Sequence, residues 1–386
     1  MSLNSVELFA GAGGLGLGLH QAGFKTLAAV ENNKYACATL RSNKLLGENC
    51  IIHQENIRNH DYSKYSKIDL VSGGPPCQPF SFGGKHSAQN DDRDMFPEAV
   101  RAIRELKPKA FIFENVKGLL RKSFTSYFEY VLLQLQYPNI AKNSNEVWEK
   151  HLSRLEKHHT GKTNDDVSYN VVFRLINSAN YGVPQKRERV IIVGFRKGLD
   201  IHWSFPKSTH TEDSLLWEQL VTKEYWEKYN IPEPEYVGTS KALRKRSKLL
   251  ESYSEEQKIR NKPWKTTRDV IHDLPAPYIN EENTEFTNHM FRPGARSYPG
   301  HTGSYIDSPS KTLKAGVHGV PGGENMVRYE DNSVRYFTIR ESARIQTFPD
   351  EYHLSGSWSE SMRQLGNAVP VEVARVIGES VLNSIK

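Results

Sequence analysis

A cysteine in a loop rich in proline and glycine is the residue of this sequence best suited to chemistry. Cys77 lies in Ser72–Ser81 (SGGPPCQPFS), which holds three prolines and two glycines. Such a composition interrupts regular structure and fixes an irregular loop. A cysteine that only fills apolar space usually lies inside a strand or helix, whereas a loop cysteine can be exposed and held in place, as a nucleophile must be. We interpret Cys77 as a nucleophile.

Charged residues at the ends of apolar runs are the next candidates. Glu114 ends the run Ala110–Glu114, and a carboxylate there is costly unless it has a task or a partner. The alternative for Glu114 is to cap the following turn. Arg187 and Arg189 lie in Gln185–Arg189 (QKRER), where alternate residues can point to one side. Taken alone, this second segment is also typical of a solvated charge run.

A glycine-rich turn near the N-terminus indicates a ligand loop. Phe9–Gly16 (FAGAGGLG) follows an apolar run and precedes a helical pattern, so its backbone can turn tightly and present amides to a ligand. Glu31 closes the next expected strand, about 20 residues on, where a carboxylate can accept hydrogen bonds from ribose hydroxyls. Gly11, Gly13 and Gly16 also satisfy GxGxxG, so a nicotinamide or flavin enzyme, or a plain glycine turn, stays open on this motif alone.

These candidates need a scaffold, and the first half of the chain supplies one. Short apolar runs alternate with amphipathic stretches such as Pro97–Leu106, which predicts an α/β fold with a doubly wound sheet. The expected strands are Ser5–Phe9, Thr26–Glu31, Asn49–His53, Ile68–Ser72, Ala110–Glu114, Val171–Asn177 and Val190–Phe195. Ligands bind such sheets at the carboxyl ends of the strands, so Cys77, Glu114 and the glycine loop should share one edge. The polar stretch Arg121–Asp166 is expected to be a helical insertion, to which we assign no function.

Changes in local composition along the sequence predict three segments. Residues 1–196 form the catalytic and cofactor-binding domain, and residues 197–335, rich in polar and loop-forming residues, form a smaller and irregular second domain. Residues 336–386 return to the first domain. Helices are expected there at Thr338–Gln346 and Val371–Ile385.

Composition adds mild constraints. A net charge of +6 suits a polyanionic partner, but many ordinary enzymes share it. Cys37, Cys50 and Cys77 have the spacing of neither a disulfide framework nor a zinc site, so we expect a reduced intracellular chain without a metal. No apolar stretch approaches the length of about 20 residues that a membrane helix needs, and no signal peptide is evident at the N-terminus.

Together the motifs resemble the ordered set of the DNA cytosine-5 methyltransferases, of the type found in bacterial restriction–modification systems. The matching segments are Phe9–Gly14, Gly74–Ser81, Glu114–Val116, Gln185–Arg189 and Gln364–Pro370 (QLGNAVP), with further blocks at Asp92–Arg93 and Arg340–Asp350 (RESARIQTFPD). The resemblance covers about Ser5–Phe195 and Tyr336–Ile385, in family order. The expected fold is therefore the Rossmann-like sheet of the S-adenosylmethionine-dependent methyltransferases, with a target-recognition domain.

The resemblance implies a reaction. The Cys77 thiolate would add to C6 of the target cytosine, and C5 would then take the methyl group. Glu114 would contact the N3 and exocyclic amine edge, while Arg189, with Arg187, would hold the O2 side. Loss of the C5 proton would expel Cys77. A stacked base is out of reach of such a pocket, so the cytosine should be flipped out, and the loop Phe82–Asp92 would close over it.

S-adenosyl-L-methionine is the cofactor that the resemblance implies, and its expected contacts lie at both ends of the chain. They are Phe9, Gly11, Gly13, Gly14, Glu31, Asn56 and Asn367. Asn56 is a departure, because the family often has an aspartate beside the adenine and this sequence has Glu55-Asn56-Ile57. Asn367 matches the C-terminal motif that packs near the cofactor.

Double-stranded DNA is the expected partner. The residues expected to contact it are Gln78, Ser81, Lys241, Arg244, Lys245 and Arg246. Lys241–Lys248 carries five positive charges in eight residues; such a run is often a solvated face, but here it can contact phosphates. The loops Arg292–His301 and Thr312–Gly323 offer side chains for base edges in the major groove. The segment from Arg196 to Arg335 would be the target-recognition domain.

Three other functions fit the sequence less well. A nicotinamide-dependent oxidoreductase leaves Cys77, Glu114 and the C-terminal motif unexplained. A transfer-RNA methyltransferase of the same fold would carry a Cys-Phe-Thr in its recognition region, and no cysteine follows Cys77. A DNA-binding module without chemistry would have no reason to keep every catalytic residue. We expect a stand-alone bacterial enzyme, monomeric and cytoplasmic, which allows functional pairing with a restriction endonuclease.

Overall fold

The chain divides into two compact units in the computed structural model. The structure describes residues 3–44, 46–47, 49–76, 94–161, 167–235, 240–252, 261–279, 285–315 and 325–386. The first unit comprises Met1–Ile176, Glu188–Pro206 and Ala374–Lys386, and the second comprises Asn177–Arg187 and Lys207–Val373. These borders differ from the expected ones, because the chain first enters the second unit at residue 177, returns to the first for residues 188–206, and leaves the second unit for good only after residue 373.

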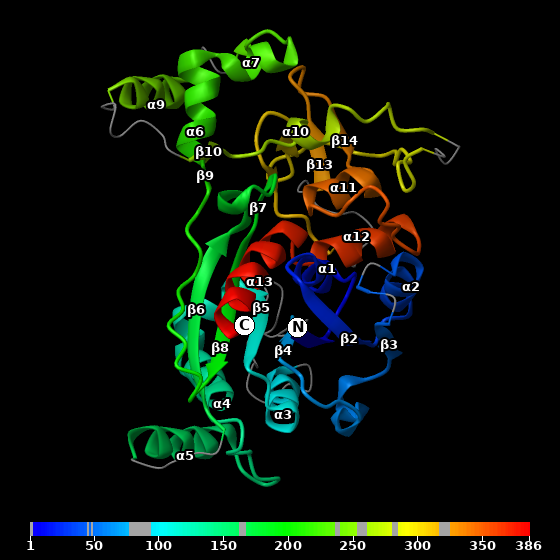
Figure 1. Cartoon of the computed structure of the whole chain (residues 1–386). Coiled ribbons are helices and arrows are strands. Elements are labelled where there is room, and N and C mark those ends of the chain that lie inside the picture. The colour runs from blue at the N-terminus through cyan, green and yellow to red at the C-terminus, as the bar shows by residue number, and fades with distance from the viewer. Residues whose placement is uncertain are drawn as a thin grey trace. The chain divides into compact units, whose positions relative to one another are not determined.

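The first unit is built on a seven-stranded sheet of order β3-β2-β1-β4-β5-β8-β6 (Figure 1). Its strands are β1 (Leu3–Leu8), β2 (Phe24–Glu31), β3 (Ile51–Gln54), β4 (Leu70–Gly73), β5 (Ala110–Val116), β8 (Glu188–Arg196) and β6 (Tyr169–Asn177). The strands from β3 to β5 are parallel, and β8 runs antiparallel to β5. All seven expected strands are present within a few residues of their predicted bounds, so the predicted α/β fold is confirmed.

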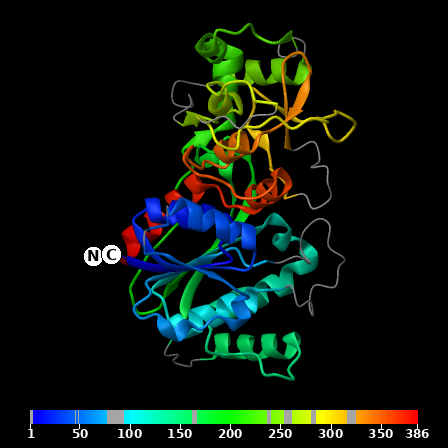
Figure 2. The same ribbon diagram turned by 90° about the vertical axis from the view of Figure 1, so that its right-hand side faces the viewer.

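Helices cover both faces of this sheet, with α1 and α2 on one face and α3 and α4 on the other (Figure 2). The helices of this unit are α1 (Gly14–Gln21), α2 (Lys34–Asn43), α3 (Phe96–Leu106), α4 (Thr125–Gln136), α5 (Trp148–Thr160) and most of α13 (Val371–Ile385). The ends of β1 and β4 approach each other closely where the chain leaves β4. A Cβ atom at Gly73 would lie 2.4 Å from the carbonyl oxygen of Leu8, so only glycine fits there.

The segment that was expected to be a polar insertion contributes to the core. Helix α4 buries Tyr127, Phe128, Val131 and Leu135 in the main hydrophobic cluster of the first unit. Its tyrosines and glutamines made it look polar, but the tyrosine rings are buried. Helix α5 packs on α4 and adds Leu155 to the same cluster. The interpretation of the whole stretch as an insertion was therefore wrong for α4.

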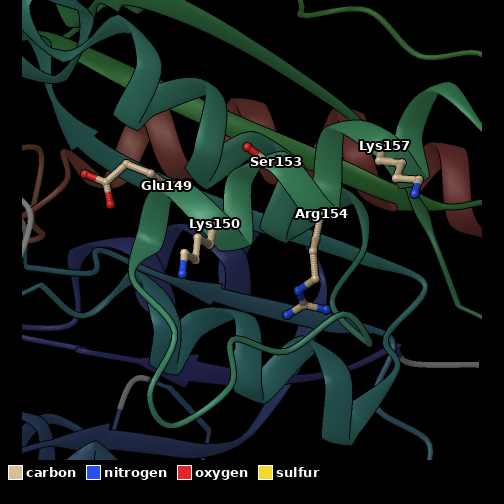
Figure 3. A pocket seen from close by; sticks show the side chains of 5 residues that line it. All are labelled: Glu149, Lys150, Ser153, Arg154 and Lys157. Carbon is tan, nitrogen blue, oxygen red and sulfur yellow. The ribbon is translucent and has the colours of Figure 1, made fainter.

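The outer face of α5 carries a shallow hollow of about 390 Å³ (Figure 3). It is lined by Glu149, Lys150, Ser153, Arg154 and Lys157. The lining is mostly cationic, and the guanidinium of Arg154 is held by Glu146 at 2.7 Å. None of the residues predicted to do chemistry lies in this hollow.

The second unit consists of short elements joined by loops. Its helices are α6 (Glu212–Trp217), the π-helical turn η8 (Glu218–Thr222), α7 (Glu224–Tyr229), α9 (Lys241–Glu251), α10 (Arg268–Ile271), α11 (Ile339–Ile345) and α12 (Trp358–Asn367). Its strands are β7 (Gln185–Lys186), β9 (His210–Thr211), β10 (Lys262–Pro263), β11 (Ser304–Tyr305), β12 (Ser310–Lys311), β13 (Met326–Arg328) and β14 (Val334–Tyr336). Apolar residues such as Leu215 and Trp226 form a buried cluster in this unit, and a buried polar group also helps to order it. Asp307 accepts hydrogen bonds from Tyr225 and Arg268 at 2.9 and 2.6 Å.

Among the described residues, none of the helices is both long and apolar enough to cross a membrane.

Candidate active site

The carboxyl edge of the sheet brings the expected catalytic segments together. Strands β4 and β5 are parallel neighbours in which Gly73 pairs with Phe113, so Glu114 lies beside the point where the chain leaves β4. The amide nitrogen of the Asn115 side chain donates a 3.0 Å hydrogen bond to the carbonyl oxygen of Pro75. A Cβ atom at Gly74 would lie 3.5 Å from the Oε2 atom of Glu114. The backbone that leads to the nucleophile loop is thus fixed against Glu114 and Asn115.

Cys77 itself lies outside the described residues, as do Gln78, Ser81 and the Asp92–Arg93 block. Their roles stay predictions. The described backbone ends at Pro76, whose carbonyl oxygen accepts a hydrogen bond from the amide of Met95 on the far side of the loop, at 3.2 Å. Both ends of the loop are therefore anchored at the same edge of the sheet.

Glu114 and Arg189 form a buried ion pair at this edge. The Nε atom of Arg189 lies 2.8 Å from Oε1 of Glu114, and only 15% and 10% of the two side chains is exposed. The pair forms because β5 and β8 are antiparallel, with Val116 opposite Arg189. Burial lowers the pKa of Arg189, and the carboxylate of Glu114 opposes that shift. The guanidinium offsets the cost of keeping a carboxylate at the end of an apolar strand.

Arg187 makes a different set of contacts. Its Nη2 atom donates to the carbonyl oxygen of Gly366 at 2.9 Å, and its side chain is fully buried in the second unit. A Cβ atom at Gly366 would lie 2.3 Å from the backbone nitrogen of Ala315. Because they alternate in the sequence, Arg187 and Arg189 were expected to point to one side. The chain passes from β7 to β8 between them, so the two side chains have different partners.

A glutamine pair that the sequence reasoning missed joins three distant motifs within the second unit. Gln185 donates to the Oε1 atom of Gln346 at 3.2 Å. Gln346 in turn donates to the carbonyl oxygens of Leu365 and Ala368. The segments QKRER, RESARIQTFPD and QLGNAVP are therefore linked by side-chain amides. Their co-occurrence in the sequence was the only available signal.

The glycine loop forms a tight turn at the same edge of the sheet. Phe9, Gly11 and Gly13 have φ values of 53°, 54° and 75°, in the left-handed region. The amide of Gly11 donates to Oε2 of Glu31 at 2.8 Å, and the amide of Asn33 donates to Oε1 at 2.7 Å. A Cβ atom at Gly11 would have no neighbour within 4 Å, so there is open space in front of the loop. Gly13 caps helix α1, which begins at Gly14.

Glu7 is a buried carboxyl group beneath this loop, and the sequence reasoning missed it. The amide of Gly16 donates to Oε1 of Glu7 at 2.9 Å, and a Cβ atom at Gly16 would lie 2.0 Å from Oε2. Burial, with a smaller contribution from the charge of Glu31, raises the pKa of Glu7 to about 8. The available signal was a glutamate inside the apolar run that precedes Phe9.

The two asparagines expected at the cofactor lie in different units. Asn56 follows β3, is exposed, and accepts a 3.1 Å hydrogen bond from the amide of Arg58 at the start of a short 3-10 turn, η1 (Ile57–Asn59). Asn367 is the exposed last residue of α12 in the second unit. Their roles toward a cofactor stay predictions.

The basic run folds into helix α9, which separates its charges by face. The exposed cations are Lys241, Arg244, Lys245 and Lys248, at the three- and four-residue spacing of one helical face. Arg246 lies on another face and forms an ion pair with Asp213. Leu250 is buried on that inner side. Of the four helix residues expected to contact DNA, three therefore share the exposed face and Arg246 does not.

Comparison with known proteins agrees with this arrangement. The profile of the family described as C-5 cytosine-specific DNA methylase matches residues 3–138 and 142–383. The Type II methyltransferase M.PspPI of Psychrobacter sp. (strain TA137) is 34% identical over 390 residues, covering 100% of this chain and 80% of the relative. The Type II methyltransferase M.Eco47II of Escherichia coli is 31% identical over 387 residues, covering 98% of this chain and 78% of the relative.

Two solved structures share the fold. One is a putative DNA modification methyltransferase encoded within an E. coli prophage, with a TM-score of 0.62 at 19% identity over 100% of this chain and 99% of that one. The other is the Dnmt2 methyltransferase of S. pombe, with a TM-score of 0.55 at 16% identity over 99% of each chain. The resemblance drawn from the motifs is confirmed: since the family profile spans nearly all of the sequence, the chain belongs to the C-5 cytosine-specific DNA methylases.

Proposed function

We propose that this enzyme methylates C5 of a cytosine flipped out of a short double-stranded DNA site, through a transient covalent bond between Cys77 and C6. Family membership supports the overall reaction. The observation that carries the mechanism is the buried pair of Glu114 and Arg189, set beside the backbone that leads to Cys77. That pair has the polarity needed to hold the edge of a pyrimidine while a thiolate attacks it.

The covalent step solves a problem of reactivity. C5 of cytosine is a poor nucleophile, and formation of a bond between Sγ of Cys77 and C6 makes C5 enamine-like. Glu114 lies at the N3 and exocyclic amine edge and stabilises the charge that develops there. Arg189 compensates Glu114 and serves the O2 side. After methylation, removal of the C5 proton returns its electron pair to the ring as the Cys77–C6 bond breaks.

The residues around the glycine loop fit S-adenosylmethionine, which supplies an electrophilic methyl group when bound. The space in front of Gly11 admits a ligand to the backbone. Each carboxylate oxygen of Glu31 accepts one backbone amide and keeps a further lone pair for ribose hydroxyls. Phe9, Gly13 and Gly14 complete the loop, and Asn56 and Asn367 are the remaining proposed contacts.

The second unit would bind and read DNA. The exposed cations of α9 are suited to phosphates. Arg246 forms an ion pair with Asp213. Gln78 and Ser81 flank the nucleophile and would meet the flipped nucleotide. The names of the two relatives described above, both Type II methyltransferases, support the role of a methylase in a restriction–modification system. In this proposal the enzyme acts as a monomer, protects the DNA, and is paired in function with a restriction endonuclease.

The test is transfer of labelled methyl groups from S-adenosylmethionine to unmethylated genomic DNA, followed by bisulfite sequencing. We expect 5-methylcytosine at one short sequence. Cys77→Ser should lower the rate by at least about 1,000-fold while cofactor binding persists, because the serine hydroxyl is a much weaker nucleophile. A rate near that of the wild type in this variant would refute the covalent route.

A trapping experiment separates mechanism from affinity. DNA with 5-fluorocytosine at the target cannot lose a proton from C5, so the adduct with Cys77 should persist through denaturing electrophoresis. Glu114→Gln should slow adduct formation more than it weakens DNA binding. If only DNA binding falls in Glu114→Gln, the carboxylate positions the base and does not assist the addition.

A further inference from the structure

Three potential metal ligands meet at the end of β3, in the same segment as the proposed cofactor contact Asn56. His53, Glu55 and His60 each offer one ligand atom, and these atoms all lie within 4.8 Å of one another. The Oε1 atom of Glu55 is 2.7 Å from Nδ1 of His60 and 3.7 Å from Nδ1 of His53. The three residues belong to one eight-residue segment, His-x-Glu-x4-His.

The two separations that involve Glu55 are close to those between ligand atoms of a tetrahedral zinc site. With metal bonds of about 2.0–2.1 Å, two ligand atoms in such a site lie about 3.3 Å apart. The Glu55–His60 distance is shorter than this and the Glu55–His53 distance is longer. A movement of about half an ångström by the half-exposed carboxylate of Glu55 therefore brings both toward the required value.

The histidine His53 is set up to bind through Nδ1. Its Nε2 atom is hydrogen-bonded to the hydroxyl of Tyr65 at 2.9 Å, which leaves Nδ1 facing Glu55. A partner of this kind on the second ring nitrogen is usual for metal-bound histidine, because it fixes the tautomer and the ring orientation.

The backbone that carries the ligands is held from outside. Arg101 of α3 donates to the carbonyl oxygens of Ile57 and His60 at 2.7 and 3.1 Å. The amide of Glu55 donates to the carbonyl oxygen of Glu31 at 3.1 Å. The His60 ring is buried and stacks on Tyr65. The backbone of this segment and the ring of His60 would therefore need little further ordering when a cation binds.

We propose that His53, Glu55 and His60 form a site for Zn²⁺ or a divalent cation of similar preference, with a fourth position open to water. Two neutral imidazoles and one carboxylate suit such a cation better than Mg²⁺ or Ca²⁺, which prefer oxygen ligands. The cation would tie the end of β3 to the turn η1. The spacing of the cysteines gave no sign of this site, because none of its ligands is a thiolate.

The site can be tested on the full chain without any assay of methylation. Metal-free protein is titrated with Zn²⁺ against a chromophoric chelator, and we expect one tight equivalent. His53→Ala and His60→Ala should each abolish that equivalent, and Tyr65→Phe should weaken it by about 10- to 100-fold. The control is His202→Ala, which removes a histidine with 96% of its side chain exposed and should change nothing.

Two further measurements keep the outcomes distinct. Thermal melting without metal shows whether each variant is folded, and Glu55→Gln offers a milder change than the alanine variants. Co²⁺ in place of Zn²⁺ should give visible absorption from nitrogen and oxygen ligands, with no strong near-ultraviolet band from sulfur. Absence of tight binding, binding unchanged in folded His60→Ala, or a sulfur band that places the metal on a cysteine would each overturn the proposal.

Discussion

In the buried ion pair of Glu114 and Arg189, removal of either side chain would leave the charge of the other uncompensated. Removal of the guanidinium leaves a carboxylate that is only 10% exposed without compensation. Arg189→Ala should therefore lower the free energy of unfolding by about 3–5 kcal/mol, measured by urea denaturation. The matched control is Lys117→Ala, which breaks an ion pair with Glu188 whose side chains are 55% and 46% exposed. That change should cost less than about 1 kcal/mol, and equal losses in the two variants would contradict the argument.

The buried carboxyl group of Glu7 predicts a pH dependence of stability. Its pKa is raised from 4.5 to about 8 by burial, so the folded chain holds a proton that the unfolded chain releases. The stability contributed by this proton is present below about pH 4.5 and is lost as the pH rises toward 8, with a slope of up to about 1.4 kcal/mol per pH unit. Glu7→Gln mimics the protonated group and should remove this slope.

The measurement for Glu7 is the difference in unfolding free energy between wild type and Glu7→Gln at several pH values. Other titrating groups are common to both proteins and cancel in the difference. We expect the free energy of unfolding of Glu7→Gln to rise steadily relative to that of the wild type between pH 5 and about pH 8. A difference that does not change with pH would show that Glu7 is ionised in the folded chain.

Single residues were predicted well where local pattern determines their place. Glu114 was found because a carboxylate at the end of an apolar strand is unusual, and its strand is present as expected. The partner of Arg187 was not predictable, because the Gly366 carbonyl lies 179 residues away in the sequence. Glu7 was overlooked because one glutamate in an apolar run looks like an ordinary strand residue until the sheet buries it.

At the level of elements, strands were easier to predict than the helix between them. Apolar runs bounded by polar residues identified all seven strands, including the antiparallel β8. Helix α4 was misread because tyrosine counts as half polar in a sequence, and its rings are buried in the structure. Hydrogen bonds such as that between Tyr130 and His151 satisfy the hydroxyl and lower the cost of this burial.

Helix α9 gives a prediction about DNA affinity. Lys241 and Lys245 lie on its exposed face, one turn apart. The double variant Lys241→Ala, Lys245→Ala should weaken binding of any DNA sequence. The plot of log affinity against log salt should also become shallower, by about one for each phosphate that is no longer neutralised. Fluorescence anisotropy at several salt concentrations measures both quantities.

The control for α9 is a second pair of exposed lysines on a helix of the first unit. Lys150 and Lys157 project from α5 beside the hollow shown in Figure 3. Their double alanine variant has the same change in net charge and should keep the salt dependence of the wild type. If both double variants weaken DNA binding equally, net charge and not the face of α9 is responsible.

At the scale of the whole molecule, the order of the motifs along the chain does not indicate which of them contact one another. Residues 177–187 leave the first unit to join the second, and the segment that follows them returns to the sheet as β8. The border expected at residue 336 was placed by a change in composition. The helices α11 and α12 nevertheless belong to the second unit, because side chains such as Gln346 bind within it. Contacts between segments that are far apart in the chain leave no local pattern in one sequence.

A substitution at Gly366 would test how closely α12 must approach the backbone at Lys314 and Ala315. Inside a helix, alanine is intrinsically better than glycine by about 1 kcal/mol, so Gly366→Ala would stabilise α12 if propensity decided the outcome. The added Cβ atom would instead lie 2.3 Å from the nitrogen of Ala315 and 2.5 Å from the carbonyl carbon of Lys314. Backbone cannot rotate away as a side chain can, so we expect a net loss of about 1–3 kcal/mol in the free energy of unfolding. Asn367→Ala, one exposed residue further on, should leave stability within about 0.5 kcal/mol of the wild type. Stabilisation by Gly366→Ala would show that the segment at Ala315 yields, and that helix propensity decides the outcome.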